Sequence, residues 1–167
     1  NIILESEEFL MIMASDKDRN EMISEWETII DLGDSWYYYV ANQEPPLNWN
    51  QVNFNSSSWS IGPSGFGYGD NDDNTETSQI ISVFIRKTFQ ISDPENISKA
   101  LFHIDYDDGY IAYLNGVEFS RTNMGSVGDE VSYNQNATDL HEAELYQGIF
   151  PESVDINLEE HSLNIGN

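Results

Sequence analysis

The sequence predicts an all-β protein built as an antiparallel β-sandwich, and three observations support this. Two dipeptides, Asp108-Gly109 and Asn115-Gly116, suit the central positions of type I′ hairpin turns, with β-branched and aromatic residues on both sides. Short strand-like segments alternate with long polar loops, and few segments have a helical period. A chain of 167 residues is also long enough for one complete domain with a core.

The two dipeptides predict a meander of three antiparallel strands at residues 100–107, 110–114 and 117–121. Side chains alternate along the first of these strands, so that Ala100, Phe102, Ile104 and Tyr106 share one side. We therefore expect one face of this meander to cover a core.

Several other segments are expected to form strands. Residues 9–14 form a short apolar run, typical of a buried strand, whereas residues 16–26 suit a helix, a linker or the end of a preceding domain equally well. Residues 35–40 have strong β propensity, and residues 80–91 are the longest strand candidate. Between them, residues 42–64 predict a long loop pinned by its aromatic side chains. A short helix within 137–146 and a last strand at 154–158 complete the expected elements.

Charge and composition narrow the classes of partner. The chain has 30 Asp plus Glu against 6 Lys plus Arg, a formal net charge of -24, which repels nucleic acid and anionic membrane surfaces. It has no cysteine, which excludes disulfides, thiolate metal sites and a Cys nucleophile. The composition fits a secreted or cell-surface β-module, and the many carboxylates favour divalent cations such as calcium.

One acidic loop is a candidate calcium site. Asp70, Asp72 and Asn74 place oxygen-bearing side chains at alternate positions, as calcium loops do. The loop is not an EF-hand, because Thr75 stands where that loop needs glycine. The alternative is a solvated acidic loop tip without a metal.

A second acidic cluster contains Asp105, Asp107 and Asp108. Paired carboxylates serve glycoside hydrolysis, but Asp108 belongs to a predicted tight turn, so a structural turn is the favoured interpretation. The alternatives are a calcium or a sugar-hydroxyl role. The three histidines have no zinc spacing and the chain has no nucleophile-elbow motif, so we expect no catalytic residues.

The aromatic residues are numerous enough to form a stacking platform for a sugar, whose C–H face packs against rings. Trp49, Trp59 and Tyr68 lie in loop-like sequence and are the main candidates, together with Tyr106 and Asp107 beside the first predicted turn. The alternative is that these rings belong to the core or anchor their loops.

Five segments, taken in order, resemble a galactose-binding-like jelly-roll module of secreted bacterial multidomain proteins. They are residues 35–39, Trp49 with residues 54–59, residues 65–70, residues 84–89 and the meander at 107–116, and the likeness covers about residues 26–166. Such modules occur beside lamin-tail-like, spore-coat-kinase-like, phosphoesterase or glycan-degrading domains. The resemblance implies a jelly-roll sandwich in which some members bind carbohydrate, many hold a structural calcium and others only join domains.

The same resemblance sets the expected domain limits. Residues 1–25 resemble the closing strand of a lamin-tail-like domain, or form a linker, and residues 26–167 form the sandwich. Related sequences continue into a further apolar strand, so the resemblance implies that this chain lacks the last strand of its sandwich.

The sequence thus predicts a non-catalytic accessory module of a secreted protein, which binds a polysaccharide or glycan and holds a structural calcium. The alternative is a structural or protein-docking module that spaces or assembles neighbouring domains without binding sugar. Neither interpretation involves nucleic acid or insertion into a membrane.

Overall fold

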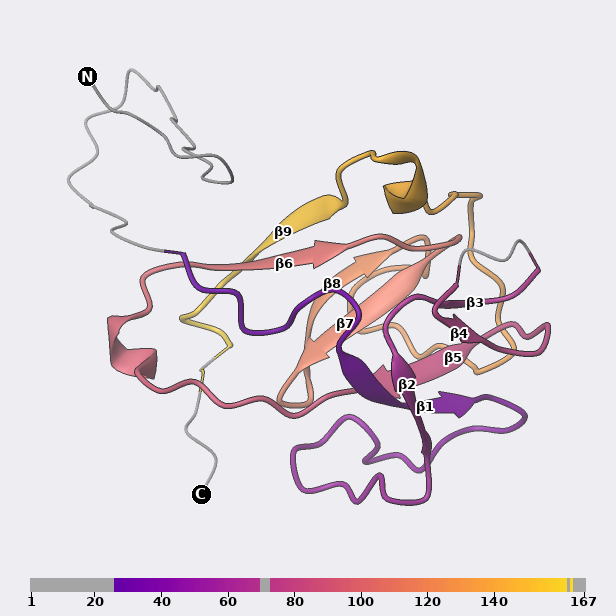
Figure 1. Cartoon of the computed structure of the whole chain (residues 1–167). Helices are drawn as coiled ribbons and strands as arrows, with labels where there is room; N and C mark the ends of the chain where they lie inside the picture. Colours follow the sequence, from indigo (N-terminus) through magenta and orange to yellow (C-terminus); the bar gives the residue numbers. More distant parts are fainter. Residues whose placement is uncertain (1–25, 70–72, 162, 164–167) are drawn as a thin grey trace.

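The structure is a computed structural model that describes residues 26–69, 73–161 and 163. It is an all-β fold, as predicted, with two single turns of 3₁₀ helix, η1 and η2 (Figure 1). In chain order the elements are β1 (Ser35–Val40), β2 (Ser60–Pro63), β3 (Phe66–Gly67), β4 (Thr75–Glu76), β5 (Val83–Arg86), η1 (Pro94–Asn96), β6 (Ala100–Ile104), β7 (Tyr110–Leu114), β8 (Val117–Thr122), η2 (Leu145–Gln147) and β9 (Glu152–Ile156).

The strands form one three-stranded sheet and three pairs. The larger sheet has the order β2-β1-β5, with both neighbours antiparallel to β1. Strands β6 and β9 form an antiparallel pair, as do β7 and β8. The short strands β3 and β4 are parallel, so the fold is not purely antiparallel.

One of the two predicted hairpins forms. Asn115 and Gly116 have φ angles of 52° and 83°, the positive values that a type I′ turn requires, and they join β7 to β8. The predicted meander is wrong at its first turn, because β6 pairs with β9 and β7 pairs only with β8 among the described residues.

The segment between β6 and β7 bends because its groups have other partners. A Cβ on Gly109 would lie 2.8 Å from the carbonyl oxygen of Thr122, so only glycine allows the chain to pass there. The carboxylates of Asp105 and Asp108 bind backbone amides of residues 141–145. The segment is thereby tied to a distant loop and does not close a two-residue hairpin.

Other boundaries differ from the prediction in smaller ways. The strand expected at 80–91 is confined to β5, after which Lys87 pairs with Asp34 at 3.0 Å and donates to the carbonyl of Ser35. The helix expected within 137–146 is the single turn η2, and the last strand is β9. The strand expected at 9–14 and the whole segment 1–25 lie outside the described residues.

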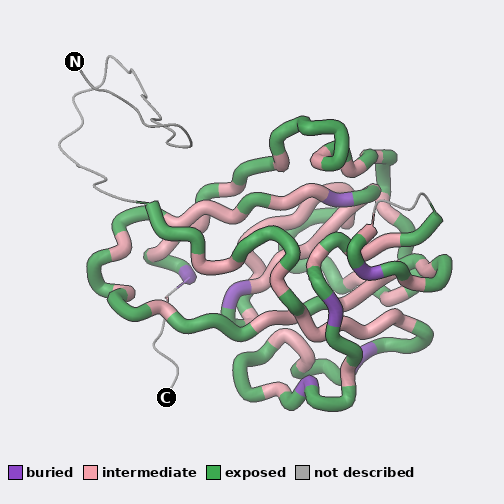
Figure 2. Tube along the Cα trace, in the orientation of Figure 1, coloured by how far each residue is buried: buried purple, intermediate pink, exposed green. Residues whose placement is uncertain are grey.

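The interior is sparsely filled. Among the described residues, Tyr106 and Leu114 are the buried large apolar side chains, each 9% exposed, and no described side chain is completely buried. Figure 2 shows the same pattern as short, scattered buried stretches. An open space of about 4630 Å³, continuous with solvent, extends among the strands and loops. Polar contacts must therefore fix much of the chain.

A buried ion pair on β8 is the clearest of these contacts. Between Ala112 and Tyr113 the β7–β8 register shifts, so β8 carries one extra residue, Phe119. Residues three apart on a regular strand point to opposite faces, but a bulge changes the alternation and lets Glu118 and Arg121 meet. Their side chains are 11% and 2% exposed and form two hydrogen bonds of 2.7 and 2.8 Å.

The same pair holds the loop after β8. The Arg121 guanidinium also donates to the carbonyls of Met124 and Asp129, at 2.7 and 3.0 Å. The hydrogen bonds that Arg121 donates to the Glu118 carboxylate hold the pKa of that carboxyl below its ordinary value, and the same bonds raise the pKa of Arg121.

Substituting Glu118→Gln should lower the free energy of unfolding by about 3 kcal/mol at pH 7, because it leaves the buried guanidinium without its counter-ion. Urea unfolding followed by tryptophan fluorescence measures this. The folded-state pKa of Glu118 is depressed, so its contribution is complete above the ordinary value of 4.5 and disappears as the pH falls through the folded value.

The difference between wild type and Glu118→Gln should therefore shrink below about pH 4.5. The exposed residue Glu95 supplies the control, Glu95→Gln, which should change stability by less than about 0.5 kcal/mol. A difference that stays constant from pH 7 to pH 3 would contradict the assignment.

Candidate ligand-binding site

An aromatic cluster is built where the loop at 42–59 crosses the β2-β1-β5 sheet. Tyr39 on β1 and Phe84 on β5 are partners in the register, so their side chains share one face. Trp59 stacks on Tyr39 with ring centroids 5.6 Å apart, and Trp49 meets Phe84 edge-on at 5.0 Å. Trp49 and Trp59 also stack on each other, at 6.3 Å. The two tryptophans attach the loop to the sheet.

Arg86 fixes the same loop through its backbone. Its guanidinium donates to the carbonyls of Trp49 and Gln51, at 2.7 and 3.2 Å, and lies 5.2 Å from the centre of the Phe54 ring. Burial lowers the pKa of Arg86, yet a guanidinium remains protonated at neutral pH. The guanidinium thus holds residues 49–54 in place against the sheet.

A pocket of about 370 Å³ opens beside this cluster, which is the size of a small-ligand site. Its apolar walls come from Tyr39, Phe54, Trp59 and the Pro45-Pro46 turn. Its polar lining consists of Gln43, Glu44, Asn55 and Ser58.

Two polar contacts shape the pocket wall. The Tyr39 hydroxyl donates to the side chain of Asn42 at 2.9 Å. The Glu44 carboxylate accepts the Ser132 hydroxyl at 2.8 Å and the Tyr133 amide at 3.0 Å. Glu44 therefore couples the pocket to a second loop. With rings, amides, hydroxyls and one carboxylate but no Lys or Arg in its lining, the pocket suits a neutral polyhydroxylated ligand.

The predicted ligand-binding residues do not form one site. Trp49 and Trp59 come together, but Trp59 lines the pocket whereas Trp49 packs behind it against Phe84 and Tyr113. Tyr68 is 45% exposed beside the acidic loop. Asp107 is exposed, and Tyr106 belongs to a different cluster.

Tyr106 is packed against His141. Their rings stack with centroids 4.1 Å apart and planes 14° from parallel, and Nδ1 of His141 lies 2.8 Å from the Tyr106 carbonyl oxygen. The Tyr106 hydroxyl donates to Glu152 on β9 at 3.1 Å. Burial raises the pKa of Tyr106, and the hydrogen bond and charge of Glu152 raise it further. One face of the Tyr106 ring is thus unavailable to a sugar.

The neighbouring carboxylates bind backbone. Asp105 accepts the amides of Glu144 and Leu145 at 3.1 and 2.8 Å, and Asp108 accepts the amide of His141 at 3.0 Å. The predicted tight turn at Asp108 does not form, and the Asp108 carboxylate instead accepts a backbone amide of a distant loop. The sequence does not reveal that Asp105 and His141 hold this loop in place, because the residues that they bind lie over 30 positions away along the chain.

The predicted calcium loop is only partly described. Asp70 and Asp72 lie outside the described residues, and the exposed Asn74 donates its side-chain amide to the Ser64 carbonyl at 2.9 Å. Asp73 packs against Gly67, where a Cβ would overlap its carboxylate. Within residues 26–69, 73–161 and 163, no group of three or more His, Asp or Glu side chains is placed to hold a metal ion.

No family model, curated protein or solved structure matches this chain. Within the described part of the chain, no helix is long and apolar enough to cross a membrane.

Replacing Asp105 by alanine should release the backbone of Glu144 and Leu145, because their amides lose the carboxylate that accepts them. Hydrogen exchange should show at least about tenfold faster exchange at these two amides, which corresponds to about 1.4 kcal/mol of lost local stability. Glu142→Ala, an exposed carboxylate of the same segment, is the control. Unchanged protection in Asp105→Ala would show that other contacts hold the segment.

Proposed function

We propose that this chain is a non-catalytic module of a secreted or cell-surface protein and that it binds carbohydrate in the pocket beside Tyr39 and Trp59. The observation that carries the proposal is the pocket itself, which joins ring walls to a polar lining that includes Glu44 and Asn55. The pocket is partly open to solvent, and its volume of about 370 Å³ lies within the range of small-ligand sites. We also propose that the strands are arranged as a jelly-roll sandwich, as the resemblance implies.

The chemistry of the walls supports a sugar ligand. Rings of Phe54 and Trp59 offer apolar edges to C–H groups, while the amide and carboxylate groups accept or donate hydrogen bonds to hydroxyls. Binding requires complementarity only to the ground state, so a module of this kind needs no catalytic pair. The formal charge of -24 disfavours uronic and sulfated glycans.

Trp59→Ala should weaken binding of a neutral oligosaccharide at least about fivefold, since a stacked or edge-packed ring contributes about 1 kcal/mol or more. Glycan-array screening selects the oligosaccharide, and isothermal titration calorimetry measures its Kd. Gln43→Ala removes a polar wall group whose side chain, within the described part of the chain, is not hydrogen-bonded to the rings, so it separates lost binding from lost packing.

Trp26→Ala, at a tryptophan outside the pocket, is the matched control and should leave the Kd unchanged. If no glycan binds, or if Trp26→Ala and Trp59→Ala weaken binding equally, the pocket is not the sugar site.

Calcium bound by the loop at residues 70–76 is the second part of the proposal, supported by the alternate oxygen-bearing side chains of Asp70, Asp72 and Asn74. Excess calcium at about one hundred times its Kd should raise the thermal midpoint by about 5 °C or more relative to EDTA, because the folded state alone binds the ion. Asp72→Ala should abolish the shift, and Glu159→Ala should retain it. Identical midpoints in EDTA and calcium would remove the metal from the proposal.

A structural or docking module remains the second candidate function. It is favoured by one specific observation, an exposed apolar segment near β9 at residues 140–150. That segment is separate from the Tyr39–Trp59 pocket, and its side chains do not line it.

A further inference from the structure

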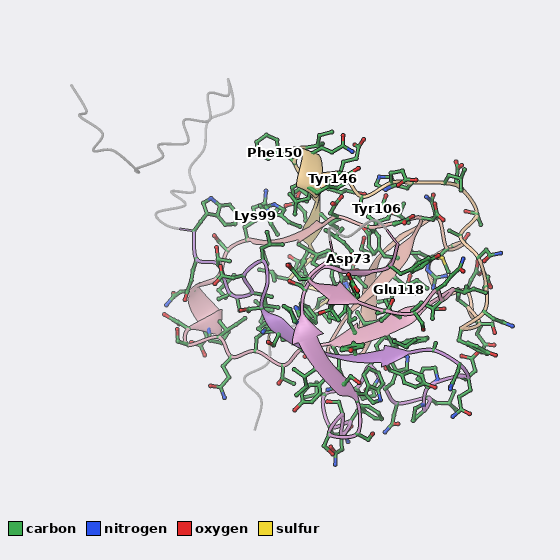
Figure 3. All side chains as sticks on the ribbon, turned by 45° about the vertical axis from the view of Figure 1, so that its right-hand side comes forward. Asp73, Lys99, Tyr106, Glu118, Tyr146 and Phe150 are labelled. Atoms are coloured by element: carbon green, nitrogen blue, oxygen red, sulfur yellow. The ribbon has the colours of Figure 1, made fainter. Side chains whose placement is uncertain are left out.

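Residues 140–150 present large apolar side chains to solvent, and we call this segment the apolar tip. Leu140 is 87% exposed, Tyr146 65%, Ile149 46% and Phe150 93%. Figure 3 shows Tyr146 and Phe150 close together around η2, directed away from the strands. Single exposed apolar residues are ordinary, but four within eleven residues of sequence indicate an interaction surface.

The tip is held in a defined conformation. The Asp105 carboxylate binds the amides of Glu144 and Leu145, and the Asp108 carboxylate binds the amide of His141. The His141 ring also stacks on Tyr106. At the other end Gly148 has a φ of 82°, a left-handed conformation that ends η2 and directs the chain toward Phe150. A loop ordered in advance loses little entropy on binding.

The charges around the tip are all negative. Asp139, Glu142, Glu144 and Glu152 lie in the tip or next to it, and the sequence has no Lys or Arg after Arg121. Lys99, which precedes β6, is bound to Asp155 on β9 at 3.0 Å. A partner must therefore offer an apolar surface together with positive charge.

We propose that the apolar tip docks on a protein partner whose apolar surface is bordered by Lys and Arg side chains. The apolar contact that becomes buried on binding is made by Tyr146, Ile149 and Phe150. The surrounding carboxylates pair with the cationic border of the partner. A second copy of this chain is a poor partner because each copy has a formal charge of -24, and anionic membrane surfaces are repelled for the same reason.

The chemistry of the partner is tested with two synthetic peptides added to the whole chain. One is an amphipathic helix with Leu on one face and Lys on the other, and the matched peptide has Ser in place of each Leu. Fluorescence anisotropy of the labelled peptides gives the Kd, and ¹H–¹⁵N chemical-shift changes locate the contact. The Leu–Lys peptide should bind at least about tenfold tighter than the Ser–Lys peptide, with the largest shifts at residues 140–150.

The double substitution Tyr146→Ser and Phe150→Ser should remove that preference, whereas Leu47→Ser, at a fully exposed leucine of another loop, should retain it. Affinity should fall as salt rises, because charges form the border of the contact. Equal affinity for the two peptides, or shifts centred outside the tip, would overturn the proposal.

A third arm uses vesicles of zwitterionic phosphatidylcholine. Because the proposed partner is a protein, the vesicles should not bind. Binding that depends on Phe150 would instead identify the tip as a membrane contact and overturn the proposal.

The Leu47→Ser control and an unchanged thermal midpoint in the double variant exclude unfolding as the cause of any loss of peptide binding.

Discussion

Long loops expose backbone amides and carbonyls that need partners, and in this domain a few charged side chains supply them. Arg86 binds the carbonyls of Trp49 and Gln51, and Arg121 binds those of Met124 and Asp129. The Asp105 carboxylate accepts two backbone amides near η2. Since no described side chain is completely buried, these polar contacts carry a share of the structural order that a dense core carries elsewhere.

This use of cations determines the electrostatic character of the surface. The described part of the chain contains Arg86, Lys87, Lys99 and Arg121, and each of them binds a carboxylate or backbone carbonyls. The remaining carboxylates are not balanced by any other Lys or Arg in that part of the chain. The surface field is therefore strongly negative, which disfavours anionic ligands and favours cationic partners.

Local features of the fold could be predicted from the sequence, and long-range pairings could not. The aromatic run at 35–40 matches β1, and Asn115-Gly116 forms its turn, because each depends on neighbouring residues. The β6–β9 pair joins residues about fifty positions apart, and nothing near Ala100 specifies Ile156 as its partner. The turn predicted at Asp108-Gly109 is wrong for the same reason, because the Asp108 carboxylate accepts the amide of His141 in a distant loop.

In the candidate site, too, local features could be predicted from the sequence and long-range contacts could not. Sequence position alone put Trp49 and Trp59 in one loop, and both are in the aromatic cluster, but only the structure shows that Trp59 lines the pocket while Trp49 packs behind it. The pocket and the apolar tip have separate supports: the first depends on Arg86 and β5, the second on Asp105 and Asp108. The two regions are nevertheless connected, because Glu44 in the pocket wall binds Ser132 and Tyr133 in the loop that precedes the tip. Under the two proposals a glycan and a protein would occupy different surfaces of the chain, and simultaneous binding to a linked pair of ligands would raise the overall affinity without any new contact.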